Sequence, residues 1–469
     1  MTRGMIVLSL VAVLTLGACG YDDNYRGYGG YGNGNGYGYG GGNGYPATNQ
    51  QALLEVLHAS PDAPPVNVLL DGKTLYSSLD YPQGTGQIPV DATTSHTLAV
   101  QAQIPGAPTT VIGPVTESFA ADTVYTVVAE GPVASIGPVV FSHPQSAIAP
   151  SMTRVQVLHA APAAPSVAVY VTAPGAALAS STPFATFAFK GSVGPTDIAA
   201  GEYEIRVTPA GAVTPVLFDS GTVNLQSGED LLLAAVQNTG PGSAPIAIAS
   251  VDQDGRNQLL LDVATPATVR VVHDVADAPA IAVIASGNVA APLVASLAFP
   301  NFTAYLAETP GQYSLAVTPA TNTADILLEQ PVNLSAGSQH TFYALGTLAD
   351  IRALVTRDDD RRIATQAELR IIHGSPSAGP VDVYLVPTGS SITAVAPTFA
   401  SVFFGGDTGF QGVVAGAYDV IITPAGSKTP ATLPLAVTLK DSGIYTAVAR
   451  DAAGGGTPLG LILLDDFAG

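Results

Sequence analysis

Four histidines occupy the same place in four copies of one short motif, and they are the first residues to test for chemistry. The first copy reads VLHASPDAP over residues 56–64, and each copy opens a segment of roughly a hundred residues. The four are His58, His159, His273 and His373. Histidine can serve as a general base or bind a metal, but a metal site needs several ligands close together, usually near one another in sequence.

Each copy offers only one such histidine, and no His-x-x-x-His, Cys-x-x-Cys or His-Glu-x-x-His pattern occurs in the sequence. Residues four and two positions before each histidine are apolar, as Leu54 and Val56 are before His58. Side chains alternate along a strand, so the histidine shares their inward face. We therefore predict that its ring nitrogens bond backbone groups of the proline-containing corner that follows. No catalytic, cofactor or metal site is predicted.

A second landmark is a strand that begins with Gly-x-Tyr and ends with Thr-Pro-Ala. It occurs three times, at residues 201–210, 311–320 and 416–425, and the first repeat lacks it. Its tyrosines are Tyr203, Tyr313 and Tyr418. They resemble a tyrosine corner, in which the hydroxyl holds a neighbouring loop, and we predict a structural role for them.

The spacing of short β-rich runs, with Pro and Gly between them, predicts an all-β fold. We count about seven strands in each unit and expect four tandem immunoglobulin-like antiparallel β-sandwiches. The predicted repeats are residues 52–146, 154–252, 266–357 and 367–469. Short linkers between similar domains predict a rod of beads in line.

The amino terminus indicates where the protein resides. An apolar run from Met5 to Leu16 follows Arg3, and it is too short to span a bilayer. We predict a signal peptide over residues 1–18. The next tetrapeptide, LGAC, resembles the lipobox of bacterial lipoproteins, which implies a lipid on Cys19 and, because Gly20 follows, an outer-membrane location. Residues 19–51 are rich in Gly, Tyr and Asn, and they predict a disordered linker.

The composition argues against a nucleic-acid-binding protein and against a fold stabilised by disulfides. The chain has 36 acidic against 16 basic residues, a net charge of −20, so it lacks the basic clusters of a nucleic-acid binder. Cys19 is the one cysteine, so no intramolecular disulfide can form. The stability of each repeat must come from buried apolar surface.

The His-x-Ser-Pro-x-Ala-Pro opening, the alternating strand after it and the Gly-x-Tyr strand together resemble the bacterial domain of unknown function 4397 family. The resemblance covers residues 52–466, in four tandem copies, and is weakest in the third, where Ala276 replaces proline. It implies a β-sandwich and an extracytoplasmic setting, and it implies no activity.

We therefore expect a non-enzymatic, lipid-anchored envelope or surface protein whose sandwiches act as a spacer or adhesive module. The expected partners are the membrane, through Cys19, and an envelope or matrix polymer or protein; no nucleic acid and no cofactor are expected. One alternative is an array of carbohydrate- or matrix-binding modules, although the sequence contains no Trp for sugar stacking. Another is a histidine-dependent enzyme or metal-binding protein.

Overall fold

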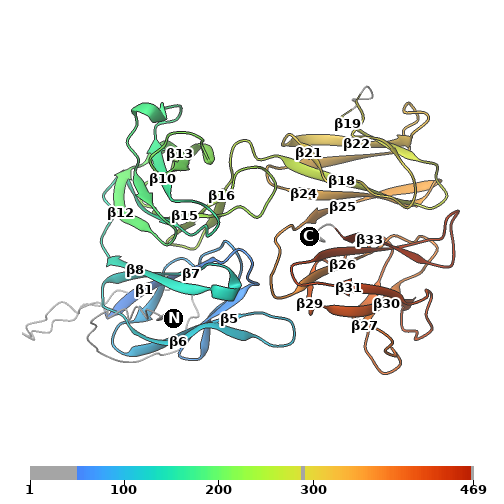
Figure 1. Cartoon of the computed structure of the whole chain (residues 1–469), viewed down its shortest axis with the longest axis horizontal. Helices are drawn as coiled ribbons and strands as arrows, with labels where there is room; N and C mark the ends of the chain where they lie inside the picture. Colours follow the sequence, from blue (N-terminus) through green and yellow to red (C-terminus); the bar gives the residue numbers. More distant parts are fainter. Residues whose placement is uncertain (1–49, 287–290, 466–469) are drawn as a thin grey trace, which may run out of the picture.

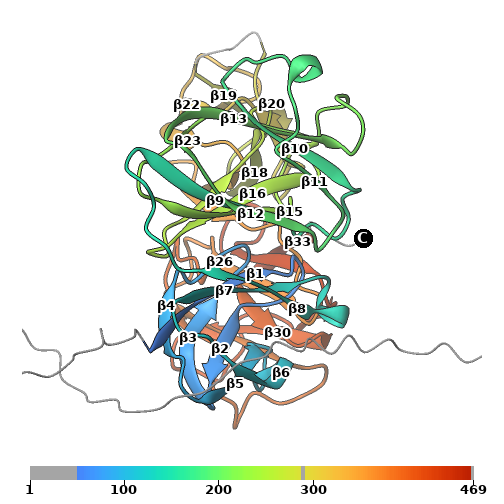
Figure 2. The same cartoon turned by 90° about the vertical axis from the view of Figure 1, so that its left-hand side faces the viewer.

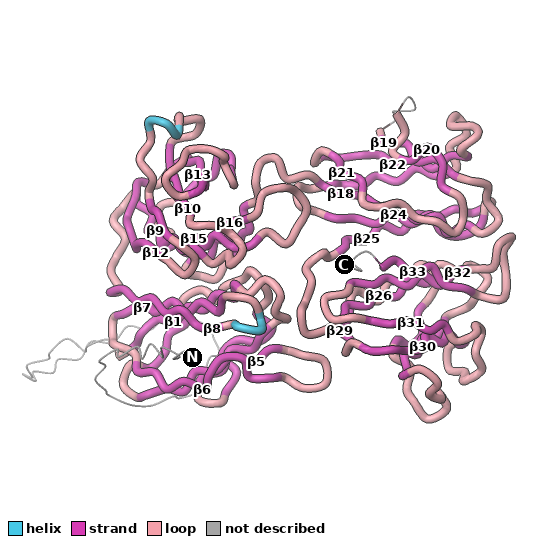
Figure 3. The backbone as a smooth tube through the Cα atoms, viewed as in Figure 1, coloured by secondary structure: helices cyan, strands magenta, loops and turns pink. Residues whose placement is uncertain are grey.

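The computed structural model describes residues 50–286 and 291–465. The predicted signal peptide, Cys19 and nearly all of the predicted linker lie outside these residues. Strands and loops make up the described chain, with two single-turn 3-10 helices (Figure 3). Within the described residues, no helix is long and apolar enough to cross a bilayer.

Repeat 1 contains β1 (Gln51–Ala59), β2 (Val66–Leu70), β3 (Lys73–Leu79), β4 (Ile88–Asp91), β5 (Ser95–Ala102), β6 (Thr109–Ser118), β7 (Thr123–Glu130), the 3-10 turn Val133–Ser135 and β8 (Gly137–Pro144). Repeat 2 contains β9 (Met152–His159), β10 (Val167–Thr172), the 3-10 turn Leu178–Ser180, β11 (Ala185–Phe187), β12 (Ser192–Ala199), β13 (Gly201–Pro209), β14 (Phe218–Leu225), β15 (Asp230–Gln237), β16 (Ile246–Asp252) and β17 (Asn257–Leu260).

Repeat 3 contains β18 (Ala267–Val275), β19 (Ile281–Ala285), β20 (Val294–Leu297), β21 (Leu306–Glu308), β22 (Gly311–Pro319), β23 (Leu328–Leu334), β24 (Gln339–Thr347) and β25 (Asp350–Asp358). Repeat 4 contains β26 (Ala367–His373), β27 (Val381–Pro387), β28 (Phe399–Val402), β29 (Gln411–Val413), β30 (Gly416–Pro424), β31 (Leu435–Leu439), β32 (Ile444–Arg450) and β33 (Gly460–Asp465).

Each repeat is a sandwich of two sheets with one recurring strand order. In repeat 1 the sheets run β4-β1-β7-β8 and β3-β2-β5-β6, and the other repeats follow the same order, with β17 added to the first sheet of repeat 2. The predicted tandem β-sandwich fold is confirmed, with eight strands in the common unit where we counted about seven.

The strand pairing differs from the purely antiparallel pairing that we expected. The first strand of each repeat pairs in parallel with the seventh, as β1 does with β7, whereas the other pairings are antiparallel. Alternation along a strand reports which face is buried, and it does not report which strand lies alongside. The alternation of apolar residues therefore could not predict the parallel pairing of the first and seventh strands.

The interior of each sandwich is built from the alternating positions that the sequence marks. Leu54 and Val56 on β1 pack with Val66 and Val68 on β2 in the core of repeat 1. The corresponding residues of the other three repeats lie in their own cores. The predicted inward faces of the first two strands are thus confirmed.

The four sandwiches form a two-by-two block, and the predicted rod is wrong. Repeat 1 packs on repeat 2 and repeat 3 on repeat 4, so that two pairs lie side by side (Figure 1). Within each pair, the outer faces of the sheets that carry the first strands face one another (Figure 2). The residue just before each histidine lies in these interfaces, and all four are apolar and buried: Leu57, Leu158, Val272 and Ile372.

Candidate functional site

The four histidines lie at the first corner of each sandwich, and none has measurable exposure. In repeat 1, Nε2 of His58 is 3.1 Å from the carbonyl oxygen of Pro64, and Nδ1 accepts the backbone N–H of Ser60 at 3.3 Å. Nε2 therefore carries the proton. His159 and His273 make the same two contacts, and His373 makes the Nε2 contact with Gly379.

Burial disfavours the charged imidazole, and it lowers the pKa of His58 to about 4. The pKa values of the other three are lowered for the same reason. Each ring thus stands neutral inside its own repeat with its proton directed to a backbone carbonyl. The structure keeps the four histidines in separate corners and does not bring them together.

The tyrosines of the Gly-x-Tyr strands also make one repeated contact. The hydroxyl of Tyr203 donates to the carbonyl of Ala199 at 2.7 Å, that of Tyr313 to Thr309 at 2.8 Å and that of Tyr418 to Val414 at 2.8 Å. Each bond joins the strand to the backbone four residues earlier, which in repeat 2 is the last residue of β12. In this way the tyrosine holds the approach to its own strand.

Sequence reasoning missed the residues that join the repeats. The polar residue three positions before each histidine lies on the outer face of the first strand. These four side chains are buried between repeats: Glu55, Gln156, Arg270 and Arg370. The available signal was the apolar residue beside each histidine, because a strand that is apolar on both faces is usually covered on both.

Arg270 and Arg370 meet Asp358 between repeats 3 and 4. Nη2 of Arg370 lies 2.6 Å from Oδ1 of Asp358, and Nη2 of Arg270 lies 3.8 Å from Oδ2; all three side chains are 1% exposed. Thr356 also donates to Asp358 at 2.9 Å, and Tyr305 does so at 2.7 Å. Buried charges require this degree of pairing, because each has lost its hydration. We call these residues the buried charge cluster.

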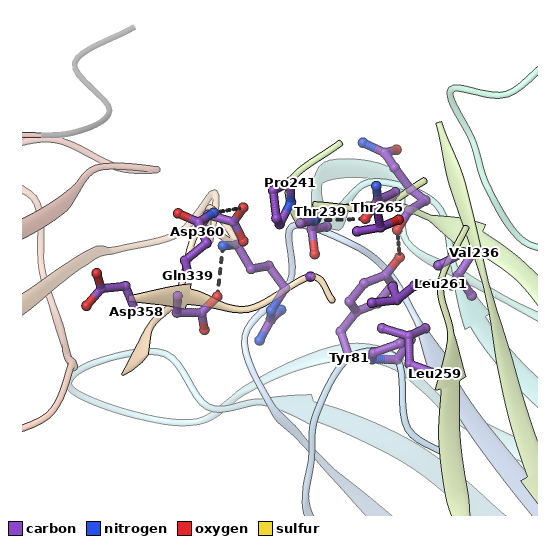
Figure 4. A pocket seen from close by; sticks show the side chains of 18 of the residues that line it. Tyr81, Val236, Thr239, Pro241, Leu259, Leu261, Thr265, Gln339, Asp358 and Asp360 are labelled. Atoms are coloured by element: carbon purple, nitrogen blue, oxygen red, sulfur yellow. Dashed lines mark hydrogen bonds between the residues drawn. The ribbon is translucent and has the colours of Figure 1, made fainter. Parts of the chain in front are cut away.

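A cleft of about 630 Å³ lies where all four repeats meet, and we call it the junction cleft. Repeats 1 and 2 supply an apolar wall that includes Tyr81, Leu259 and Leu261. On the opposite side, Gln339 of repeat 3 and Asp360 of the following linker supply polar groups (Figure 4). An apolar surface opposite carboxylate and amide groups could accept a ligand that has an apolar face and hydroxyl groups at its edge.

Arg361 holds the junction together from the linker between repeats 3 and 4. Its Nη1 donates to the carbonyl of Ala63 at 2.6 Å, and its Nη2 pairs with Asp80. The guanidinium also lies 5.7 Å from the centre of the Tyr81 ring. Tyr81 in turn donates a hydrogen bond to the carbonyl of Gln237 in repeat 2. One linker residue thereby connects the second pair of repeats to the first.

The cleft carries one perturbed carboxyl group. Burial, followed by the nearby charge of Asp359, raises the pKa of Asp360 to about 6, and Gln339 donates a hydrogen bond to it. Among residues 50–286 and 291–465, no group of three or more His, Cys, Asp or Glu side chains is placed to hold a metal ion.

Two segments of the chain match a known protein family. Residues 52–170 and 267–384 match DUF4397, a domain of unknown function. The chain belongs to this family. Each match begins at the first strand of one repeat and continues into the second strand of the next. The two DUF4397 segments therefore start in repeats 1 and 3, the first member of each face-to-face pair.

Other comparisons add little to the DUF4397 match. No curated protein matches the chain. The Bacillus anthracis TIE protein is 12% identical with a TM-score of 0.16; the match covers 82% of this chain and 65% of that one, less than two thirds of its length. A candidate cell adhesion protein of Bacteroides fragilis is 9% identical with a TM-score of 0.13, covering 43% of this chain and 97% of that one. Neither likeness carries an argument about function.

Proposed function

We propose that this DUF4397 protein is a non-enzymatic, lipid-anchored protein of the bacterial envelope. Its four sandwiches, each a copy of the family domain, serve as a spacer or adhesive block that Cys19 attaches to the outer membrane. The observation that carries the proposal is the repeated corner. The four histidines are the residues of the repeated motif that could act as an acid, a base or a metal ligand. They are fully buried and hydrogen bonded to backbone in every repeat. The outer surface and the junction cleft remain for partners.

Replacement of the lipid-bearing residue tests the anchor. Cys19→Ser removes the thiol that the lipid would modify, so the protein should leave the membrane fraction for the soluble one, which immunoblots of separated fractions measure. A matched control is Ser9→Ala, which leaves the thiol in place and should stay with the membrane. Unchanged membrane partition of Cys19→Ser would contradict lipid anchoring.

Adhesion is tested separately with intact cells. A strain that lacks the protein should lose attachment to a surface or matrix, and the full chain should restore it. The Cys19→Ser chain, released from the cell, should not restore it. If attachment and envelope integrity are the same with and without the protein, the adhesive role is wrong.

The junction cleft favours a second candidate, the binding of a polysaccharide. Leu259, which is 44% exposed, belongs to the apolar wall, whereas Leu433, 88% exposed, lies on a loop of repeat 4 outside that wall. Leu259→Asp should weaken binding of a neutral glycan, found by screening a glycan array, by about tenfold or more, since an ionised carboxylate would oppose the apolar face of the sugar. Leu433→Asp is the matched control and should bind normally. Equal affinity of the two variants would place the glycan elsewhere.

A further inference from the structure

A glutamate lies between repeats 1 and 2. Glu55 on β1 is 5% exposed, and its Oε2 accepts a hydrogen bond from Thr126 of the same repeat at 3.2 Å. The neighbouring repeat presents two further acids to it, Asp230 at the start of β15 and Asp252 at the end of β16. Three carboxyl groups therefore share one sheet-to-sheet interface.

The basic side chains beside these acids are already engaged. Nε of Arg154 lies 2.9 Å from Asp197, and its Nη1 lies 4.0 Å from Asp230. Nη1 of Arg256 lies 2.9 Å from Asp252, and this arginine is largely exposed. Both arginines thus pair with the acids of repeat 2, whereas the hydrogen bond to Glu55 comes from a neutral hydroxyl group.

The interface between repeats 3 and 4 contains a carboxyl group at a different position. Asp274 on β18 is 2% exposed, and neither of its carboxyl oxygens has a hydrogen-bond partner. A Cβ added to Gly374 would lie 1.9 Å from Oδ2 of Asp274, so the carboxyl group rests directly on the backbone of repeat 4. Two charges of repeat 4 act on it with opposite effect, Arg450 and Asp451.

Both groups retain a proton more strongly in the packed form than in water. Burial, with the charges of Asp230 and Asp252, raises the pKa of Glu55 from 4.5 to about 8. Burial also raises the pKa of Asp274, and Asp451 adds to the shift while Arg450 opposes it. If the two sheets separated, water would return each pKa towards its ordinary value. The packed form then binds more protons than the open form. Its stability therefore falls as pH rises from the pKa of the carboxyl group in the open form to its pKa in the packed form.

We propose that each pair of repeats is a proton-dependent latch, in which the sheets stay face to face while the buried carboxyl group carries a proton and part when it must ionise. Glu55 serves the first pair and Asp274 the second. Opening of the first pair would break the bond from Tyr81 to Gln237, two residues that line the junction cleft. The latch does not depend on what that cleft binds.

Thiol labelling of the full chain measures the opening. Cys19→Ser removes the chain's one cysteine, and Val128→Cys or Val448→Cys then places a single thiol in the first or second interface. These two valines are fully buried and occupy equivalent positions on the seventh strand of repeats 1 and 4. The labelling rate is divided by that of the denatured chain at the same pH, so that the ratio reports the opening equilibrium.

The ratio for Val128→Cys should rise by up to about tenfold per pH unit between pH 5 and 7.5, because one proton is released on opening. Glu55→Gln, which stays neutral, should remove most of the rise. Burial also raises the pKa of Glu130, which pairs with Lys190 of repeat 2 across the same interface, and this residue accounts for any rise that is left. Asp274→Asn should leave the rise in place. For Val448→Cys, Asp274→Asn should remove the rise of the labelling ratio with pH, and Glu55→Gln should leave it in place. Asp230→Asn, which removes a facing charge, should reduce the rise at Val128→Cys and provides a second test if Glu55→Gln folds poorly.

Several outcomes would overturn the latch. The same rise in Glu55→Gln, or no effect of Asp230→Asn, would show that another group releases the proton. No labelling of Val128→Cys at any pH would show that the interface does not open. A thiol in the core of the same sandwich, Val68→Cys, should label far more slowly; equal labelling would mean that the whole repeat unfolds.

Discussion

The two face-to-face interfaces use the same strands of the same sheet, yet their contents differ. Between repeats 1 and 2 the contact contains many small apolar side chains, among them Ala59, Ala160, Ala234 and Ala249. Between repeats 3 and 4 it contains Tyr343 and the buried charge cluster. One docking geometry therefore accommodates both a contact in which acids lie beside many small apolar side chains and a contact with a buried arginine–aspartate cluster.

The difference arises at two positions of the first strand. Three residues before the histidine, repeats 1 and 2 have Glu55 and Gln156, whereas repeats 3 and 4 both have arginine. One residue after the histidine, the first pair has two alanines, whereas the second has Asp274 opposite Gly374. An aspartate needs the space that a glycine leaves, so the two residues form a complementary pair. The shape of the interface comes from the sheets, and its chemistry comes from these positions.

Loss of Asp358, from the charged interface between repeats 3 and 4, should cause the largest change in the free energy of unfolding. Asp358→Ala removes the buried carboxylate that Arg270 and Arg370 share, and we expect the free energy of unfolding to fall by about 3–5 kcal/mol. Urea unfolding of the full chain, followed by circular dichroism, measures it. Asp350→Ala is the control, because Asp350 pairs with Arg352 in an exposed ion pair and should change stability by less than about 1 kcal/mol. Similar losses in the two variants would mean that the buried cluster adds no stability of its own.

The histidine corners are common to both pairs and should respond to acid alike. Since the pKa of His58 is lowered from 6.5 to about 4, the folded chain binds fewer protons than the unfolded chain in this range, and stability falls as pH drops from 6.5 towards 4. His58→Gln should remove about 3 kcal/mol of that fall. Urea titrations at pH 4.5 and 7 provide the difference between wild type and variant, and His373→Gln should act in the same direction. A pH dependence unchanged by either substitution would contradict the neutral, buried rings.

The smallest effect is expected at the complementary pair. Gly374→Ala forces a methyl group against Asp274, so we expect a loss of about 1–3 kcal/mol in the free energy of unfolding. Addition of Asp274→Ala recreates the alanine pair of the first interface and should recover most of that loss. Urea unfolding of the single and double variants yields the coupling between the two sites. Additive effects would show that the carboxyl group and the glycine do not depend on each other.

Much of the fold could be predicted because strand alternation reports burial directly. Positions such as Leu54 and Val66 marked the core faces, and the repeated histidine marked the corners. The packing of pairs could not be predicted in the same way. Leu57 is one apolar residue on a face that also carries Glu55, and local alternation does not say whether a neighbouring sheet covers them.

The junction residues were still harder to predict. Asp358 and Arg361 lie in a charged run that resembles an ordinary solvated linker, and their partners are hundreds of residues away or on another strand. A charge run has the same local pattern whether water or protein surrounds it. Only the three-dimensional path of the chain shows whether water or protein surrounds the charged run.

The β-sandwich class, the inward face of the first strands and the family of the chain all follow from the order of its residues. Those features depend on contacts within one repeat, which leave a periodic trace in the residues that make them. How the repeats meet, which acids lose their water and where the junction cleft forms are seen only in the folded molecule. These depend on surfaces distant in sequence, whose fit comes from shape and charge in three dimensions.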